Sequence, residues 1–427
     1  MDGRSRVLSD VSESELLEDE KFEDAVESFS DQEAIAKKGT PVKTQKSPSK
    51  SLKSATEEAD NGMACKTRQE SLDKGKTTAR ERRYKDMKTV QTLETSKKAN
   101  WCMRFSPCGR FLATGGADCE IRVWCSRSHQ QEIVEEVTEQ EEQLQGFATE
   151  PFAVFKGHKN EVLDIIWTDD FNLFSCSMDK DVKLWSVSAK SCLGTLRHDA
   201  CVSSAKLLPK NRNYLATLTF EGVLRLWDVP HRKVAGEIKV HDNLCTALEI
   251  IEEESIIVVG TTDGICLFFT KTLAAHSTLT ISDKKPKIFD ICSHGDKLLV
   301  TTDDSKTRMY NNKTRQFLMK FNGAPHSNSL TRGNFSADSQ FVISGAEDYC
   351  LYFWSTNAAL LSPKQEQKYM EKVKVGRAAI TAAAFAPKSD VLVRISDNVP
   401  VPDVIVCVDC NGTLTVMTTS SPPPLEP

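Results

Sequence analysis

The sequence predicts an all-β fold, a seven-bladed β-propeller with a disordered N-terminal tail. One pattern occurs seven times: an acidic turn residue, an alternating strand, and usually an aromatic residue six positions after the acid. The copies are Asp118…Trp124, Asp179…Trp185, Glu221…Trp227, Asp263…Phe269, Asp304…Tyr310, Asp348…Trp354 and a faded Asp409…Thr415. Successive acids lie 61, 42, 42, 41, 44 and 61 residues apart. A period of about 40–45 residues is typical of propeller blades with four strands each.

The two ends of the chain differ from the repeats in composition. Residues 1–87 contain few aromatic residues and many Ser, Lys and Glu residues. Such a segment cannot bury enough apolar surface to offset the entropy of ordering, so we expect a disordered tail. The propeller is predicted over 88–418, and a Pro-rich unstructured tail over 419–427.

The short segment Thr89–Leu93 alternates like a strand and precedes the first complete blade. We therefore expect it to form the outer strand of the last blade, whose inner strands are predicted at Val404–Val408 and Thr413–Val416. Pairing the first and last segments in one sheet would remove the open edge that an unclosed ring exposes.

Insertions interrupt the period at 126–150, 356–374 and 389–403. The first is rich in Glu and Gln and could be an exposed helix or a disordered loop. The second is rich in Lys, Gln and Glu and is expected to be helical in part. We expect both of these large insertions to follow the outer strand of a blade, where extra length disturbs the sheets least.

Charge and cysteine usage limit the classes of partner. The net charge is −5, so no global basic surface for nucleic acid is expected. No apolar run reaches the roughly 18 residues of a membrane span, and we expect a cytoplasmic protein whose fourteen cysteines are reduced. Cys407 and Cys410 have zinc-ligand spacing but no second pair supports them, so no metal is predicted.

Three repeats carry a recurring set of polar residues. A His precedes the first strand, a Ser or Thr lies in the second strand, an acid lies in the turn and a Trp lies in the third strand. Buried polar groups cost free energy unless they are paired, so we expect each set to share hydrogen bonds. The sets are His158, Ser175, Asp179 and Trp185; His198, Thr217, Glu221 and Trp227; and His326, Ser344, Asp348 and Trp354.

These sets favour a structural role, because they recur blade by blade whereas a catalytic set occurs once. Blade 1 has no His, and blades 4, 5 and 7 have Val259, Val300 and Ile405 at the Ser/Thr position, where hydrophobic packing must replace the network. The chain contains no GxSxG or HExxH motif and no phosphate-binding glycine loop. The sequence therefore predicts no enzyme and no cofactor, and a propeller that serves as a binding platform.

Several stretches are more specific than a generic blade. Phe155–His158, Leu163–Trp167, Ser175–Trp185, Leu299–Tyr310 and Phe341–Tyr349 resemble the rabphilin-type WD-repeat family, over roughly residues 85–416. The resemblance implies a WD-repeat propeller and an effector of a Rab-family small GTPase of recycling endosomes. In that family the GTPase-binding region lies just before the propeller, which implies a GTPase-binding cluster here at Arg80, Arg82, Arg83, Tyr84 and Lys85.

A second element lies in the tail, where residues 11–35 carry ten acids against one Lys. Leu17–Glu27 resembles the FFAT motif that binds VAP proteins of the endoplasmic reticulum. The resemblance implies that Phe22 enters a pocket, that Asp24 and Glu27 meet basic groups and that Ala25 fits a small site. The segment departs from the motif at Lys21 and Glu23. The alternative is an amphipathic helix whose one face carries Phe22, Ala25, Val26 and Phe29.

Residues 36–88 carry fifteen Lys and Arg against seven acids. The basic run 36–55 could touch anionic lipid, but it is not amphipathic, so at most peripheral membrane contact is expected.

Our main hypothesis is a non-enzymatic adaptor, peripheral at endosomal or endoplasmic-reticulum membranes. The alternative is a substrate receptor or scaffold of a ubiquitin-ligase or signalling complex. Such receptors often carry an Arg two positions beyond a Trp-Asp blade end, whereas Trp227-Asp228 is followed by Val229 and Pro230. An enzyme would need polar groups that converge at the central channel.

Overall fold

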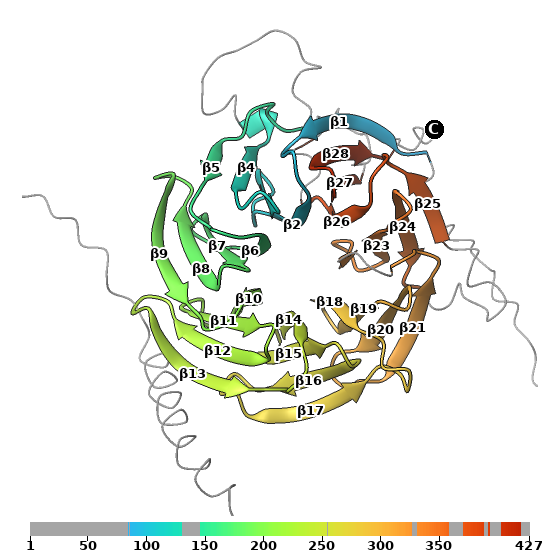
Figure 1. Cartoon of the computed structure of the whole chain (residues 1–427). Coiled ribbons are helices and arrows are strands. Elements are labelled where there is room, and N and C mark those ends of the chain that lie inside the picture. Colours follow the sequence, from blue (N-terminus) through green and yellow to red (C-terminus); the bar gives the residue numbers. More distant parts are fainter. Residues whose placement is uncertain are drawn as a thin grey trace, which may run out of the picture. The chain divides into compact units, whose positions relative to one another are not determined.

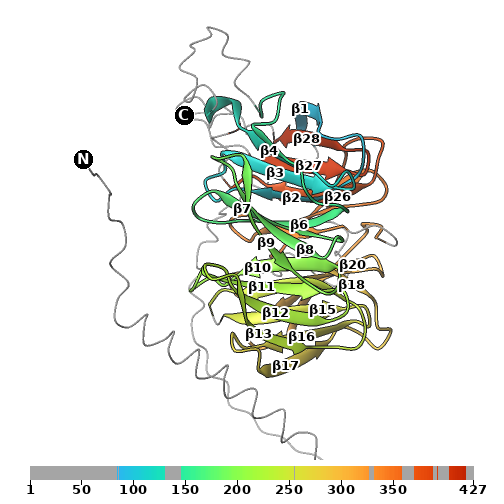
Figure 2. The ribbon, with the colours of Figure 1, turned by 60° about the vertical axis from the view of Figure 1, so that its left-hand side comes forward.

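The computed structural model describes residues 84, 86–129, 146–253, 255–326, 331–357, 370–387, 392 and 403–419. They form a ring of seven four-stranded antiparallel sheets around a central channel. Figure 1 shows the blades arranged around the centre of the ring, and Figure 2 shows the same ribbon turned by 60°. The prediction of a seven-bladed propeller is confirmed.

Each of the first six blades uses four consecutive strands, from the channel outward. Blades 1 and 2 contain β2 (Asn100–Phe105), β3 (Phe111–Gly116), β4 (Ile121–Cys125), β5 (Ala153–Phe155), β6 (Val162–Trp167), β7 (Asn172–Ser177), β8 (Asp181–Ser186) and β9 (Ser191–Arg197). Blades 3 and 4 contain β10 (Val202–Leu207), β11 (Tyr214–Thr219), β12 (Val223–Asp228), β13 (Lys233–Lys239), β14 (Cys245–Ile251), β15 (Ile256–Thr261), β16 (Ile265–Phe269) and β17 (Ala275–Thr280). Blades 5 and 6 contain β18 (Ile288–His294), β19 (Lys297–Thr302), β20 (Lys306–Asn311), β21 (Phe317–Asn322), β22 (Gly333–Phe335), β23 (Phe341–Gly345), β24 (Cys350–Ser355) and β25 (Met370–Lys374).

The seventh blade joins the two ends of the propeller. Its strands are β26 (Ile380–Phe385), β27 (Val404–Asp409), β28 (Thr413–Thr418) and β1 (Lys88–Glu94). Strand β1 is the outer strand, antiparallel to β28 from Lys88↔Thr418 to Glu94↔Thr413, and the two lie side by side in Figure 1. The first segment of the propeller thus closes the last sheet, as the alternating pattern predicted.

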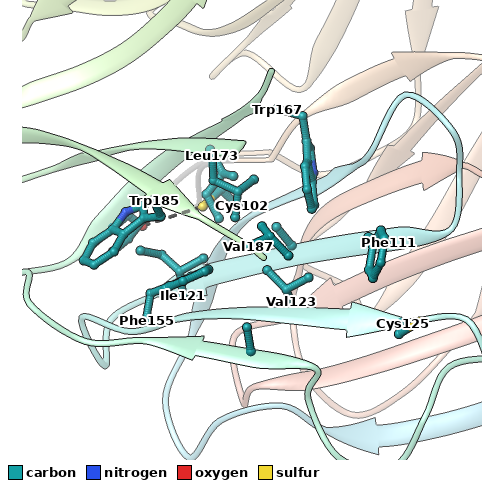
Figure 3. Packing of buried hydrophobic residues seen from close by; sticks show 14 residues of the cluster. Cys102, Phe111, Ile121, Val123, Cys125, Phe155, Trp167, Leu173, Trp185 and Val187 are labelled. Atoms are coloured by element: carbon teal, nitrogen blue, oxygen red, sulfur yellow. Dashed lines mark hydrogen bonds between the residues drawn. The ribbon is translucent and has the colours of Figure 1, made fainter. Parts of the chain in front are cut away.

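The hydrophobic core is divided into layers between neighbouring blades. The layer between blades 1 and 2 packs Ile121 and Val123 against Ile165, Leu173 and Trp185, all at most 2% exposed. Figure 3 shows most of this layer at close range. Second strands such as β3 are buried at all positions or at all but one, whereas outer strands such as β13 contain only exposed and half-buried residues. Each blade therefore depends on its neighbours to cover its faces.

The turn between the second and third strands is the repeated feature that the sequence revealed. After the acid, one residue takes a left-handed φ, and in blades 1 and 2 the acid accepts the backbone N–H two positions on, from Glu120 at 3.2 Å and Asp181 at 3.0 Å. The left-handed residues are Cys119, Lys180, Gly222, Gly264, Ser305, Tyr349 and Gly412, with φ between 59° and 82°.

This turn corrects the seventh repeat, which is shifted by two residues from the predicted Asp409…Thr415. Since Gly412 takes the left-handed φ of 82°, Asn411 occupies the acidic position and Met417 the aromatic position. Asp409 Oδ1 instead accepts N–H groups from Asn411 at 2.9 Å and Thr413 at 2.8 Å. The prediction took Asp409, the acid between the two predicted inner strands, as the turn residue.

The Ser/Thr position of blade 7 moves with that shift and falls on Cys407 rather than Ile405. Both side chains are buried, Cys407 at 2% exposure and Ile405 at 0%. Hydrophobic packing therefore replaces the polar network in this blade, although at a different residue from the one expected.

The positions of the two large insertions were also predicted wrongly. Both lie before the outer strand, between β4 and β5 and between β24 and β25, and β25 itself falls within 356–374. The base of the first insertion packs into the fold, because Phe147 is 0% exposed and exchanges two hydrogen bonds with Gln91, of 2.7 and 2.8 Å. The period locates extra residues but does not say which strand they precede.

Tyr84 anchors the chain where it enters the propeller. Its ring stacks on Phe353 at 4.3 Å between centroids and contacts Phe341 and Phe385 edge-on. Its hydroxyl lies 3.0 Å from Asp403 Oδ2, and only 1% of the residue is exposed. Tyr84 therefore joins blades 6 and 7 just before β1 completes the ring.

We expect Tyr84→Ala to lower the free energy of unfolding by roughly 3 kcal/mol, because it empties a buried aromatic site. Tyr84→Phe should cost only about 1 kcal/mol, the worth of the hydrogen bond to Asp403. Denaturant unfolding of both variants beside the wild type checks this. An alanine variant as stable as the phenylalanine variant would contradict the anchoring role.

Candidate binding site in the central channel

The polar set of blade 2 forms one continuous chain of hydrogen bonds. Trp185 Nε1 donates to Ser175 Oγ at 2.8 Å, Ser175 Oγ lies 2.7 Å from His158 Nε2, and His158 Nδ1 lies 2.8 Å from Asp179 Oδ2. Burial alone would raise the pKa of the Asp179 carboxyl, but hydrogen bonds from His158 and the Lys159 backbone lower it to about 2. Every member is paired inside the blade, which favours a structural role.

The set of blade 3 is formed without its acid. His198 Nε2 lies 2.9 Å from Thr217 Oγ1 and 3.1 Å from Trp227 Nε1. Its Nδ1 lies 3.2 Å from the Leu196 carbonyl oxygen, so the second ring nitrogen is already satisfied, and Glu221 is exposed. Burial and nearby Arg225 lower the pKa of His198 to about 4, so its ring is neutral at pH 7. The expected bond between Glu221 and His198 was wrong.

The set of blade 6 is also dispersed. His326 Nδ1 lies 2.7 Å from Thr331 Oγ1, and its Nε2 lies 3.4 Å from Ser344 Oγ. Thr331, which the sequence did not single out, takes the place of the acid because it reaches His326 directly.

The acid and the tryptophan of blade 6 bond elsewhere. Asp348 accepts from Tyr352 at 2.7 Å and Lys372 at 2.5 Å, while Trp354 Nε1 donates to the Asn322 carbonyl at 3.1 Å. The predicted four-residue set of blade 6 was therefore wrong. Tyr352 and Lys372 engage the acid, and the Asn322 carbonyl engages the tryptophan.

Blades 1 and 4 keep parts of the pattern. Trp124 Nε1 donates to Thr114 Oγ1 at 3.1 Å without a His. In blade 4, His241 Nε2 lies 3.7 Å from Asp263, a His–acid pair that the sequence prediction missed because Val259 fills the Ser/Thr position.

Most residues of the sites predicted in the N-terminal tail fall outside the part of the chain that the structure describes. Phe22, Asp24, Ala25 and Glu27 of the FFAT-like motif lie outside the described residues.

Of the predicted GTPase-binding cluster, Arg80, Arg82, Arg83 and Lys85 also lie outside the described residues. Tyr84 is buried between blades 6 and 7. Its assignment to a partner-binding surface was wrong, because the aromatic ring belongs to the core.

Polar side chains converge instead on the innermost strands. Strand pairing places equivalent residues of the seven blades at two levels, two residues apart along each strand. The upper level contains Cys102, Asp164, Ser204, Ala247, Asp290, Arg332 and Ala382, and the lower level contains Arg104, Ile166, Lys206, Glu249, Cys292, Asn334 and Ala384. Three cationic and three anionic side chains thus meet around one axis.

Arg332 of blade 6 crosses the channel to Asp164 of blade 2. Its Nη1 lies 2.8 Å from Asp164 Oδ1, and its Nη2 donates to the Leu163 carbonyl at 2.7 Å. Ser204 Oγ donates to Asp164 Oδ2 at 2.6 Å. Burial alone would raise the pKa of Asp164, but the guanidiniums of Arg332 and Arg104 hold it well below its usual range. Asp164, only 1% exposed, is a charged and fully satisfied acceptor.

A second group links blades 3, 4 and 5. Lys206 Nζ lies 2.8 Å from Glu249 Oε2, and Ser293 Oγ donates to Glu249 Oε1 at 3.2 Å. Asp290 makes no hydrogen bond or ion pair within the described part of the chain. Burial raises the pKa of its carboxyl to about 6 even though Arg332, Arg104 and Lys206 act to lower it.

A cavity of about 370 Å³ opens beside this network. Arg104, Asp164 and Lys206 provide its charged wall, and Trp167 and Pro107 are among its apolar residues. It lies where loops join the first and second strands of blades 1, 2 and 7. The sequence carried one signal for this site, a charged residue in several otherwise apolar inner strands, but only ring closure brings those residues together.

No helix among the described residues is long and apolar enough to cross a membrane, and those residues hold no cluster of metal-binding side chains.

Comparisons with known proteins agree with the repeat pattern. A family model described as "WD domain, G-beta repeat" matches residues 87–125, 149–186 and 316–355. WD repeat-containing protein 44 of Xenopus laevis is 30% identical over 361 residues, covering 73% of this chain and 40% of that protein. An uncharacterised WD repeat-containing protein of Schizosaccharomyces pombe is 27% identical over 68% of this chain and 54% of its own length. The 2-deoxy-glucose resistant protein 2 of Saccharomyces cerevisiae is 27% identical over 51% of this chain and 29% of its own length. The chain thus spans only about a third to a half of these relatives.

The contrast between blades 2 and 3 makes a direct prediction. Asp179→Ala should lower the free energy of unfolding by about 1–3 kcal/mol at pH 7, because it leaves the buried His158 without its partner. Glu221→Ala, the matched change in blade 3, should stay within about 0.5 kcal/mol of the wild type. Because the folded pKa of Asp179 is depressed, its stabilisation should be present above about pH 4 and lost as the pH falls toward 2. Equal effects of the two variants in denaturant unfolding would refute the assignment.

Asp290 should destabilise the protein at neutral pH. Because its folded pKa is raised to about 6, the folded state binds the proton more tightly than the unfolded chain, and this stabilisation is lost as the pH rises from about 4 through 6. Asp290→Asn should therefore be more stable than the wild type by about 1–2 kcal/mol at pH 8 and nearly equal at pH 4. Unfolding curves at the two pH values measure the difference, and a variant whose advantage does not grow with pH would contradict this.

Proposed function

This chain belongs to the WD-repeat family and is similar to WD repeat-containing protein 44, which supports a role as a scaffold for protein interactions. We propose that it is a non-enzymatic adaptor in membrane trafficking. It would act as a Rab GTPase effector that links endosomal membranes to the endoplasmic reticulum. The observation that carries the proposal is the match over 73% of the chain to WD repeat-containing protein 44 of Xenopus laevis.

The channel chemistry supports an adaptor over an enzyme. Asp164 is held ionised by two arginines and a serine, and Glu249 is paired with Lys206. A general base needs a carboxylate or imidazole that reaches substrate with its proton-accepting atom available. Asp164 and Glu249 already accept hydrogen bonds from neighbouring channel residues. The exceptions are Asp290, which makes no hydrogen bond among the described residues, and the cationic groups at the channel mouth.

The tail supplies the two trafficking contacts of the proposal. Phe22, Asp24, Ala25 and Glu27 would bind VAP proteins through an aromatic anchor and acidic flanks. Arg80, Arg82, Arg83 and Lys85 would contact the GTPase. Tyr84 would not touch the partner itself, because its ring is buried.

Capture by immobilised full-length protein tests the proposal. Wild type and a Phe22→Ala/Asp24→Ala variant are each probed for VAP proteins and for Rab proteins loaded with GTP or GDP. We expect VAP capture that the variant loses at least tenfold, and Rab capture that the variant retains, since the two segments are separate.

The variant is its own control for folding, because both substitutions lie outside the propeller. Failure to capture either class would overturn the trafficking role, and a scaffold in a ubiquitin-ligase or signalling complex would then take its place.

A further inference from the structure

The cavity at the channel mouth has an excess of hydrogen-bond donors. The guanidinium of Arg104 donates no hydrogen bond among the described residues and lies 3.7 Å from Asp164 at its nearest ion-pair contact. Lys206 donates to Glu249 alone, which leaves two of its three N–H groups. These side chains are 31% and 22% exposed, so both can reach a bound group.

The acceptors of the cavity wall are already occupied. Asp164 receives Arg332 and Ser204 within 2.8 Å, and its side chain is 1% exposed. A ligand that donates hydrogen bonds therefore meets no available carboxylate on this wall, whereas an anionic acceptor meets two cations. In a partly enclosed site such charge-assisted hydrogen bonds are stronger than in open water.

An apolar shoulder adjoins the charged wall. Trp167 lines the cavity and fixes its own position by donating from Nε1 to the Arg104 carbonyl at 2.9 Å. Phe111 links Trp167, at 6.3 Å between ring centroids, to Phe171, at 6.4 Å. Figure 3 shows Trp167 and Phe111 side by side at the edge of the layer.

Phe171 is exposed in an unusual way. It is 42% exposed and its backbone φ is 59°, in the left-handed region that a bulky side chain disfavours. The same turn of blades 1, 4, 5 and 6 also holds a left-handed residue (Gly109, Ser255, Gly295 and Ser339), so the conformation belongs to the hairpin, and the exposed aromatic ring is what sets blade 2 apart. Its ring contacts Phe111, which in turn contacts the cavity residue Trp167.

We propose that this channel mouth binds an extended segment of a partner protein, which inserts an Asp or Glu side chain between Arg104 and Lys206 and lays a neighbouring aromatic residue against Trp167 and Phe171. The volume of about 370 Å³ suits one or two side chains and is at the small end for ligand sites. The available N–H groups of Arg104 and Lys206 favour a carboxylate, and the aromatic rings of Trp167 and Phe171 favour an aromatic residue next to it in the partner.

No residue of the N-terminal segments belongs to this site, so the proposal holds whether or not those segments bind VAP proteins or a GTPase. It adds a docking point on the propeller to the adaptor role.

The test uses full-length protein and a displayed library of random twelve-residue peptides. Peptides selected on the wild type should be enriched at least tenfold in an acidic residue beside an aromatic one. Their affinity should fall at least tenfold for Arg104→Gln and for Lys206→Gln, and should be largely kept by Arg104→Lys. Lys284→Gln removes the same charge from an exposed turn elsewhere and should change nothing.

Thermal unfolding of each variant verifies that the propeller is folded before affinities are compared. The proposal is overturned if the library yields no acidic–aromatic enrichment, if the selected peptides bind Arg104→Gln as well as the wild type, or if Lys284→Gln weakens them equally. Direct binding of inorganic phosphate or of anionic vesicles that Arg104→Gln abolishes, with no peptide selected from the library, would also overturn it.

Discussion

Closure of the ring by β1 is the constraint on which the rest of the structure depends. Each blade covers its neighbours, so an open ring would expose two sheet faces and an unpaired strand edge. The pairing of β1 with β28 supplies the outer strand of the seventh sheet from the opposite end of the propeller. Tyr84 strengthens the junction by packing between blades 6 and 7. The contact of Arg332 with Asp164, which joins blades on different sides of the channel, exists only in a closed ring.

The sequence predicted the fold well because the repeated features are local. A turn acid, a left-handed residue and a third-strand aromatic lie within about seven residues, so their spacing survives in the linear pattern. Blade 7 was misregistered by two residues because its turn uses Asn411 where the other blades use an acid, while Asp409 bonds the same turn from an earlier position. The replacement of the acid by Asn411 at this one position therefore caused the register error, and the hydrogen bonds of the turn reveal the correct register.

The site was less predictable because its residues meet through tertiary structure alone. Nothing near Tyr84 in the sequence indicates Phe341 and Phe353 as its neighbours, and the family resemblance implied that it belonged to a GTPase-binding cluster. Glu221 and Asp348 occupy the correct turn position, but Leu196 and Thr331 satisfy the histidines instead. The propeller thus presents a cationic channel mouth beside aromatic residues, and the partner contacts proposed for the tail would use other residues. Such a division suits an adaptor, because one partner can be exchanged without remodelling the other site.

The most direct measurement of this account is hydrogen–deuterium exchange of a chain that begins at Thr95, without Tyr84 and β1, beside one that begins at Arg83. If the stability of the whole propeller depends on ring closure, the shorter chain should lose amide protection even in inner strands far from the cut, including β6, β10 and β14. The reason is that removal of β1 would lower the free energy of opening of every blade together. Loss of protection confined to β28 and β27, with β6, β10 and β14 unchanged, would contradict the account.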